Sequence, residues 1–200
     1  MQVDPSHYQK NYDDLGRFES YWTSISLVQD ITGTVLEIGS GNGFVSGYLK
    51  KYGRKVHTVD YDRRLNPDTV ASVVELPFKN KNFDVTLCCQ VLEHLPPGLF
   101  GYALCELLRV TKKKLIVSLP NTSRALGCAF VFEKWRLNIT VPIPWPRRIA
   151  KFDGQHYWEI GNIGHSLSET VEIMNKFSTV EKTWRLPGFP YHQFFVLRCK

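Results

Sequence analysis

The chain has 200 residues, enough for one domain with a core of its own. Hydrophobic residues make up 43% of the sequence and charged residues 22%, which excludes an intrinsically disordered or collagen-like chain. The formal net charge of +6 comes from short basic groups and not from one long basic arm. Charge alone therefore indicates no particular partner.

The five cysteines are odd in number and form no C-x-x-C pair, which favours a reducing compartment over a disulfide framework. No metal-ligand spacing is evident, so no metal site is expected. The sequence has no uncharged apolar run of about 18 residues and no signal peptide at its start. We therefore expect a soluble, cytoplasmic protein.

The first helix is expected over residues 15–31, where apolar residues recur at steps of three and four. These residues are Leu15, Phe18, Trp22, Ile25 and Val28. The elements that follow are, in chain order, a strand over 35–38, a glycine loop over 39–43, a helix over 44–52, strands over 55–59 and 83–89, a helix over 100–110, a strand over 114–119, a helix over 167–177 that opens with a Ser166–Glu169 capping box, and strands over 179–186 and 192–199. This alternation predicts an α/β fold: a parallel sheet with helices on both faces and an antiparallel hairpin at its end.

Residues 121–166 interrupt this rhythm and are rich in Trp, Pro and Arg. The stretch is far longer than the usual connection in an α/β unit, so we expect a lid or substrate region. The alternative is a surface excursion that patches the core with Phe130, Phe132 and Trp135.

The glycine loop carries the strongest functional signal. Gly39, Gly41 and Gly43 stand at alternate positions between a strand and a helix, where the backbone can turn sharply and offer free N–H groups to a ligand. Asp60 follows the next strand, at the place where a carboxylate can accept both ribose hydroxyls of a nucleoside. Phe44 occupies the third glycine position of dinucleotide-binding folds, which disfavours NAD or FAD.

The loop, preceded by acidic Glu37, resembles motif I of the class I S-adenosylmethionine (SAM)-dependent methyltransferases. Residues 72–78, 82–85 and 90–95 are similar to later motifs of the small-molecule, methyltransferase type 11-like branch, in the same order. The resemblance implies a Rossmann-like, doubly wound, mostly parallel seven-stranded sheet with an antiparallel C-terminal hairpin. It also implies a single domain over residues 1–200, with 121–166 as the insert, and SAM as cofactor with S-adenosylhomocysteine (SAH) as product.

The same resemblance implies roles for individual residues. The glycine loop would surround the methionine part of the cofactor with support from Glu37, and Asp60 would hold the ribose. Further expected contacts are Tyr61 and Asp62 near the adenosine, Ser72 and Val73 near the adenine edge, and Gln90 at a strand tip. Ser72 departs from the family, because many relatives have Asp there to accept a hydrogen bond from the adenine; a hydroxyl could replace it.

Methyl transfer needs a base only when the acceptor is a hydroxyl or an acidic carbon. The candidates are His156, Tyr157, Glu159 and His165, each of which could instead serve packing or a helix end. The pair Glu93 and His94 could also supply a base, but in the family this stretch usually packs the site.

We therefore expect a methyltransferase acting on a small molecule. One alternative is an RNA or other nucleic-acid methyltransferase, although the strand tip lacks the Asn-Pro-Pro-Tyr pattern of amino-directed enzymes. Another is a non-catalytic SAM-binding regulatory subunit. Residues 139–149 suggest contact with a membrane surface, but their prolines argue against an amphipathic helix. His7, Tyr8 and Tyr12 are candidates for a flap over the cofactor.

Overall fold

The computed structural model describes residues 12–199, so His7 and Tyr8 lie outside the described residues. The helices are α1 (Leu15–Gln29), α2 (Phe44–Lys51), α3 (Phe100–Val110) and α4 (Leu167–Phe177), with short 3-10 turns η2 (Arg63–Leu65), η3 (Leu92–His94) and η4 (Pro97–Leu99). The strands are β1 (Thr34–Ile38), β2 (Lys55–Asp60), β3 (Thr69–Val70), β4 (Phe83–Cys89), β5 (Thr111–Pro120), β6 (Ala125–Phe132), β7 (Trp135–Pro142), β8 (Thr179–Arg185) and β9 (His192–Arg198).

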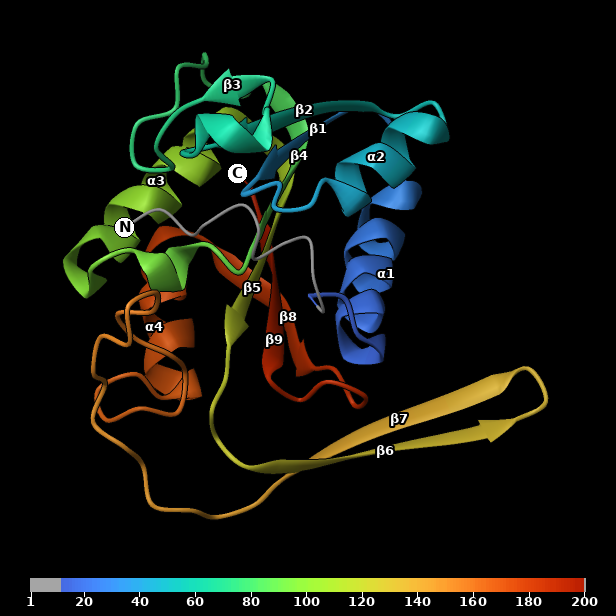
Figure 1. Cartoon of the computed structure of the whole chain (residues 1–200), viewed down its shortest axis with the longest axis vertical. Coiled ribbons are helices and arrows are strands. Elements are labelled where there is room, and N and C mark those ends of the chain that lie inside the picture. The colour runs from blue at the N-terminus through green and yellow to red at the C-terminus, as the bar shows by residue number, and fades with distance from the viewer. Residues whose placement is uncertain (1–11, 200) are drawn as a thin grey trace.

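Seven strands form one sheet in the order β3-β2-β1-β4-β5-β9-β8 (Figure 1). Strands β1 to β5 pair in parallel, whereas β9 runs antiparallel to both β5 and β8. The predicted doubly wound sheet and its antiparallel end are thus confirmed. The carboxyl ends of β1, β2 and β4 meet at one edge of the sheet, which is where parallel α/β folds bind ligands.

Side chains alternate between the two faces of the sheet, as the two-residue period of a strand requires. Leu36 and Ile38 of β1 join the core that holds α3 and α4, and Val35 joins the core that holds α1 and α2. The helix pairs therefore cover opposite faces of the sheet (Figure 1). Buried apolar contact on both faces holds the carboxyl-terminal edge rigid.

Helix α1 differs from its predicted pattern. Ile25 and Val28 are buried as expected, but Leu15, Phe18 and Trp22 are exposed. The first half of the helix buries Ser20 and Ser24 instead. The buried face there is polar because it borders a cavity and not the sheet core.

Strands β6 and β7 form a separate two-stranded sheet that projects from the body (Figure 1). Phe130, Phe132 and Trp135 lie in it and are 59%, 74% and 79% exposed. The alternative in which these three residues patch the core is therefore wrong. No helix in residues 12–199 is long and apolar enough to cross a membrane.

Candidate active site

The glycine loop leaves β1 at the carboxyl-terminal edge of the sheet. Gly39, Gly41 and Gly43 have φ angles of 74°, 51° and 72°, in the left-handed region that favours glycine. A Cβ on Gly39 would lie 2.3 Å from Cγ2 of Val91, so this position has no room for a side chain. The loop is thereby held against the segment that follows β4.

A cavity of about 390 Å³ opens beside this loop. It is bounded by the ends of β1, β2 and β4, and eight of the ten predicted cofactor residues line it: Gly39, Gly41, Asp60, Tyr61, Asp62, Ser72, Val73 and Gln90. Of the remaining two, Glu37 lines a smaller neighbouring cavity and Gly43 lines neither. Residues far apart in sequence therefore meet around one space large enough for a nucleoside-sized ligand.

Asp60 ends β2 with its carboxylate at the cavity. Its Oδ1 accepts a hydrogen bond from the backbone N–H of Asp62 at 2.9 Å. Burial raises the pKa of Asp60, and backbone hydrogen bonds from Asp62, Ser40 and Gly41 act against that rise. The carboxylate is thus pre-oriented by the backbone while it borders the cavity, as ribose recognition requires.

Gln90 follows β4 in a left-handed conformation, with φ 56°. Its backbone N–H donates to the carbonyl oxygen of Ser118 at 2.9 Å, and its Nε2 donates to Oγ of Ser118 at 3.1 Å. A non-glycine residue in this region costs about 1–3 kcal/mol and persists only where its surroundings hold it. The two hydrogen bonds to Ser118 of β5 hold Gln90 in this conformation at the edge of the cavity.

The smaller cavity lies at the other side of the loop. Glu37 lines it with 8% exposure, and burial raises the pKa of Glu37 to about 7, while hydrogen bonds from Ser46 act against the rise. Ser20 of α1 and His192 of β9 line the same space, where Nδ1 of His192 lies 2.8 Å from Oγ of Ser20. Sequence reasoning missed both, although two serines four residues apart in α1, Ser20 and Ser24, were a usable signal of a polar helix face.

The candidate bases do not share one cavity. Tyr157 lines the 390 Å³ cavity, whereas His156 and Glu159 line a larger one of about 880 Å³. His165 lines neither: its ring stacks on Trp158 at 5.2 Å between centroids. Tyr12, one of the predicted flap residues, lines both the 390 Å³ cavity and the smaller one.

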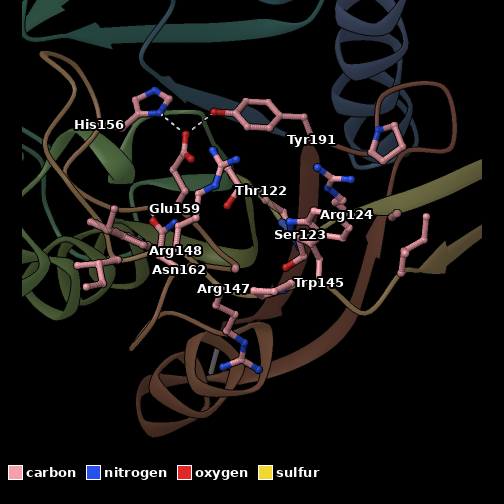
Figure 2. A pocket seen from close by; sticks show the side chains of 18 of the residues that line it. Thr122, Ser123, Arg124, Trp145, Arg147, Arg148, His156, Glu159, Asn162 and Tyr191 are labelled. Atoms are coloured by element: carbon pink, nitrogen blue, oxygen red, sulfur yellow. Dashed lines mark hydrogen bonds and ion pairs between the residues drawn. The ribbon is translucent and has the colours of Figure 1, made fainter.

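His156 is held in place by Glu159. Nδ1 of His156 lies 2.7 Å from Oε1 of Glu159, which also accepts a hydrogen bond from the hydroxyl of Tyr191 (Figure 2). Burial lowers the pKa of His156, but the bond to Glu159 and the nearby carboxylate of Glu93 outweigh it and leave the pKa above its usual value.

The larger cavity is strongly basic. Five cationic side chains border it, against two carboxylates; the cations are Arg124, Arg147, Arg148, Lys151 and Arg185 (Figure 2). The guanidinium of Arg124 stacks over Trp145 at 3.4 Å from the ring centroid. Arg185 donates to the carbonyl oxygens of Asn121 and Ser123, which fixes the start of the 121–166 insert against β8. Converging positive charge of this kind attracts anionic ligands.

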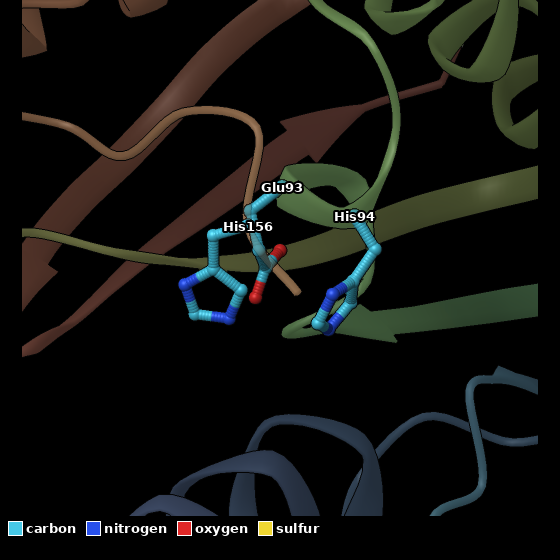
Figure 3. Close-up of side chains that lie close together, drawn as sticks. All are labelled: Glu93, His94 and His156. Atoms are coloured by element: carbon cyan, nitrogen blue, oxygen red, sulfur yellow. The ribbon is translucent and has the colours of Figure 1, made fainter. Parts of the chain in front are cut away.

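Glu93, His94 and His156 lie close together, as Figure 3 shows. His94 borders the cofactor-side cavity and His156 the basic one. Glu93 has no exposed surface, and burial raises its pKa to about 8. Sequence reasoning paired Glu93 with His94 but could not place His156 beside them.

Comparison with known proteins shows which family model and which solved structures the chain resembles. Residues 36–117, from β1 into β5, match the family model described as "Methyltransferase domain". No curated protein sequence gives a significant match. The similarity to solved structures, in contrast, extends over the whole chain.

Three solved structures illustrate that similarity. A SAM-dependent methyltransferase from Aquifex aeolicus is 17% identical with a TM-score of 0.65, and the match covers 100% of both chains. The 1,6-didemethyltoxoflavin-N1-methyltransferase of Burkholderia thailandensis, solved with its substrate and SAH, is 18% identical with a TM-score of 0.64, covering 98% of this chain and 84% of that one. Magnesium protoporphyrin IX methyltransferase from Synechocystis PCC 6803, solved with SAH, is 13% identical with a TM-score of 0.64, covering 100% of this chain and 90% of that one.

These identities are low, so the structural matches establish the fold, and the family model identifies the segment that carries the motifs. Residues 36–117 of this chain match the methyltransferase domain model, and the whole chain has the fold seen in the SAM-dependent methyltransferase from Aquifex aeolicus.

Proposed function

We propose that this protein is a SAM-dependent methyltransferase whose acceptor is a small, negatively charged molecule. The observation that carries the proposal is a pair of neighbouring cavities, one lined by the glycine loop and Asp60, the other by five cationic side chains. His94 at the first cavity and His156 at the second have ring centroids 4.9 Å apart. His156 and Tyr157 are neighbours in sequence and line different cavities, so they mark the boundary where donor and acceptor would meet.

The residues of the first cavity fit SAM. The left-handed glycines bring backbone close to the ligand, and Asp60 offers oxygens to the ribose. Ser72 and Val73 border the same cavity at the place proposed for the adenine, where the hydroxyl of Ser72 replaces the Asp of many relatives. When bound, SAM supplies a methyl group on a positively charged sulfur, ready for in-line displacement.

The protein's own task is then alignment and exclusion of water. Tyr157 would contact the acceptor at the boundary. Its backbone N–H donates to the carbonyl oxygen of Glu93 at 2.9 Å, which fixes the segment. Arg148 and Lys151 would bind the anionic group of the acceptor at a distance from the methyl donor. Imidazole and carboxylate at His156 and Glu159 could carry the acceptor's proton.

A methyl-transfer assay with tritiated SAM tests the proposal. Small carboxylates and phosphate esters should be methylated in preference to neutral analogues. Arg148→Ala should raise KM for such acceptors at least tenfold with little change in kcat, and Lys176→Ala on exposed α4 serves as the matched charge control. Methylation of RNA, with strong salt dependence, would favour the nucleic-acid alternative. Tight SAM binding without turnover on any acceptor would favour a regulatory subunit.

A further inference from the structure

Three potential metal ligands converge in the structure. One ligand atom each from Glu93, His94 and His156 lies within 4.8 Å of the others, and this is the one such group of three found in residues 12–199 (Figure 3). The chain brings them together from η3 and from the insert, 62 positions further on. Their convergence therefore results from the fold, because no local sequence motif contains all three residues.

Both histidines have the kind of outer hydrogen-bond partner that metal-binding histidines need. Nδ1 of His94 lies 3.0 Å from the carbonyl oxygen of Gln155, and a carbonyl can only accept, so this nitrogen carries the proton. Nδ1 of His156 donates to the carboxylate of Glu159 at 2.7 Å. Each ring thus has its Nδ1–H fixed by an oxygen, which leaves Nε2 to bind a metal; bound histidines almost always have such an outer partner.

The carboxylate of Glu93 has no hydrogen-bond partner on either oxygen, and its side chain is completely buried. A buried carboxylate without a partner is costly unless it is neutralised or binds a cation. The groups that face it are the two imidazoles, with Glu159 behind His156. An orphaned carboxylate between two imidazoles is the donor set of a divalent metal.

We propose that Glu93, His94 and His156 bind one divalent transition-metal ion, such as Zn²⁺, Co²⁺, Mn²⁺ or Fe²⁺. Two imidazoles with one carboxylate favour these ions over Mg²⁺ and Ca²⁺, which prefer oxygen ligands. At metal–ligand distances of about 2.0–2.2 Å the three atoms would draw together to roughly 3–3.5 Å, from separations of up to 4.8 Å in this structure. The open positions of the ion would face the cavities, where an anionic acceptor could bind.

Metal binding does not depend on the proposed methyl transfer, so it can be tested by binding measurements without an assay of enzyme activity. Protein freed of metal by chelation and dialysis is titrated with Co²⁺ alone, followed by visible ligand-field absorption, and with Zn²⁺ by calorimetry. One equivalent should bind. Glu93→Gln and His156→Asn should each weaken binding at least 100-fold, and Glu159→Gln, which removes the carboxylate bonded to Nδ1 of His156, should weaken it about 10–100-fold. His165→Asn is the matched histidine control and should leave the affinity unchanged.

Two results would overturn this site: no stoichiometric binding of Co²⁺ or Zn²⁺ by the wild type, or equal affinity in the wild type and in Glu93→Gln. Glu93→Gln is nearly isosteric, and circular dichroism with SAH calorimetry shows whether each variant is folded. Because SAH binding is measured on the same metal-free protein, failure of the metal site and failure of the proposed function give different results.

An independent observation concerns the hairpin of β6 and β7. Its register pairs Leu126 with Val141, Cys128 with Ile139, Phe130 with Leu137, and Phe132 with Trp135, and directly paired residues share a face of a sheet. One face is therefore apolar along its whole length. Seven of its eight side chains are between 39% and 79% exposed, with Trp135 the most exposed, and Cys128 is half-buried. A contiguous exposed apolar face of this kind marks a binding surface.

Positive charge adjoins the hairpin in sequence. Residues 124–151 contain six Lys or Arg and one acidic residue, an excess of five positive charges in a chain whose net charge is +6. Lys134 and Arg136 lie within the hairpin, and the other four border the basic cavity, which Ala125 at the start of β6 also lines. Two copies of this surface would repel each other, whereas an anionic lipid surface complements it. Trp135 and Phe132 lie next to the turn, and aromatic residues favour the membrane interface.

We infer that the apolar face of the hairpin docks on a membrane containing anionic lipid. Co-sedimentation with phosphatidylglycerol-containing vesicles should exceed that with phosphatidylcholine vesicles at least tenfold. Phe132→Ser with Trp135→Ser should reduce binding at least tenfold, and Val131→Ser, 70% exposed on the opposite face, is the control. No binding to anionic vesicles, or equal loss in the control, would refute the inference. A dimer that the Trp135 variant dissociates would assign the face to a second copy instead.

Discussion

Gly39 allows the geometry of the glycine loop to be tested quantitatively. Gly39 and Gly53 have nearly equal φ angles, 74° and 77°. A Cβ on Gly39 would lie 2.3 Å from Cγ2 of Val91, whereas one on Gly53 would meet no atom within 4 Å. Gly39→Ala and Gly53→Ala therefore share the backbone penalty and differ only in the collision.

The expected energies follow from that difference. A left-handed alanine costs about 1–2 kcal/mol at either position. The collision with Val91 adds about 1–3 kcal/mol at Gly39 alone. Val91 lines the proposed cofactor cavity, so Gly39→Ala should also weaken SAH binding at least tenfold, or about 1.4 kcal/mol, while Gly53→Ala leaves it unchanged.

Urea denaturation measures the loss of unfolding free energy, and calorimetry measures SAH affinity. The double variant Gly39→Ala with Val91→Ala removes the colliding methyl and should recover the collision energy in a double-mutant cycle. Equal destabilisation at Gly39 and Gly53, or no recovery in the double variant, would refute the proposed close approach of the loop to Val91.

Two further predictions concern stability. Burial raises the pKa of Glu37 to about 7 from 4.5, so between these values the folded chain holds a proton that the unfolded chain has released, and stability falls as pH rises through this range. Glu93, whose pKa is raised to about 8, adds a fall in the same direction. Glu37→Gln should therefore reduce the total fall by about 3 kcal/mol between pH of about 5 and about 8 in urea denaturation; an unchanged slope would contradict it. Ser166→Ala removes the hydroxyl that accepts from the N–H of Glu169 at 3.2 Å and should cost about 1 kcal/mol of unfolding free energy. A loss below a few tenths would show that the cap is replaced by solvent.

Much of the fold could be predicted because its signals are local. The helices at Phe100–Val110 and Leu167–Phe177 and the strand at Phe83–Cys89 have the predicted bounds. The other predicted bounds differ by at most three residues, mainly at element ends, where fraying and capping decide the limits. The position of the proposed cofactor cavity could also be predicted, because the carboxyl ends of parallel strands meet at one edge of the sheet.

The remainder depends on contacts between distant segments. The alternation of Leu126, Cys128, Phe130 and Phe132 is a strand pattern, but apolar alternation normally indicates a buried face, and here the face is exposed. His156 lies beside Glu93 only because the insert folds back over η3, which no spacing reveals. His165, three residues past Asn162 in a turn, stacks on Trp158 and stays away from both cavities.

Calorimetric titration with SAM and SAH, alongside Asp60→Ala, tests the central claim most directly. The account predicts binding of one equivalent with micromolar affinity, weakened at least tenfold in Asp60→Ala because charge-assisted hydrogen bonds of about 1.5–3 kcal/mol each would be lost. Absence of binding to the wild type, or equal affinity in Asp60→Ala, would contradict the assignment of this cavity to SAM.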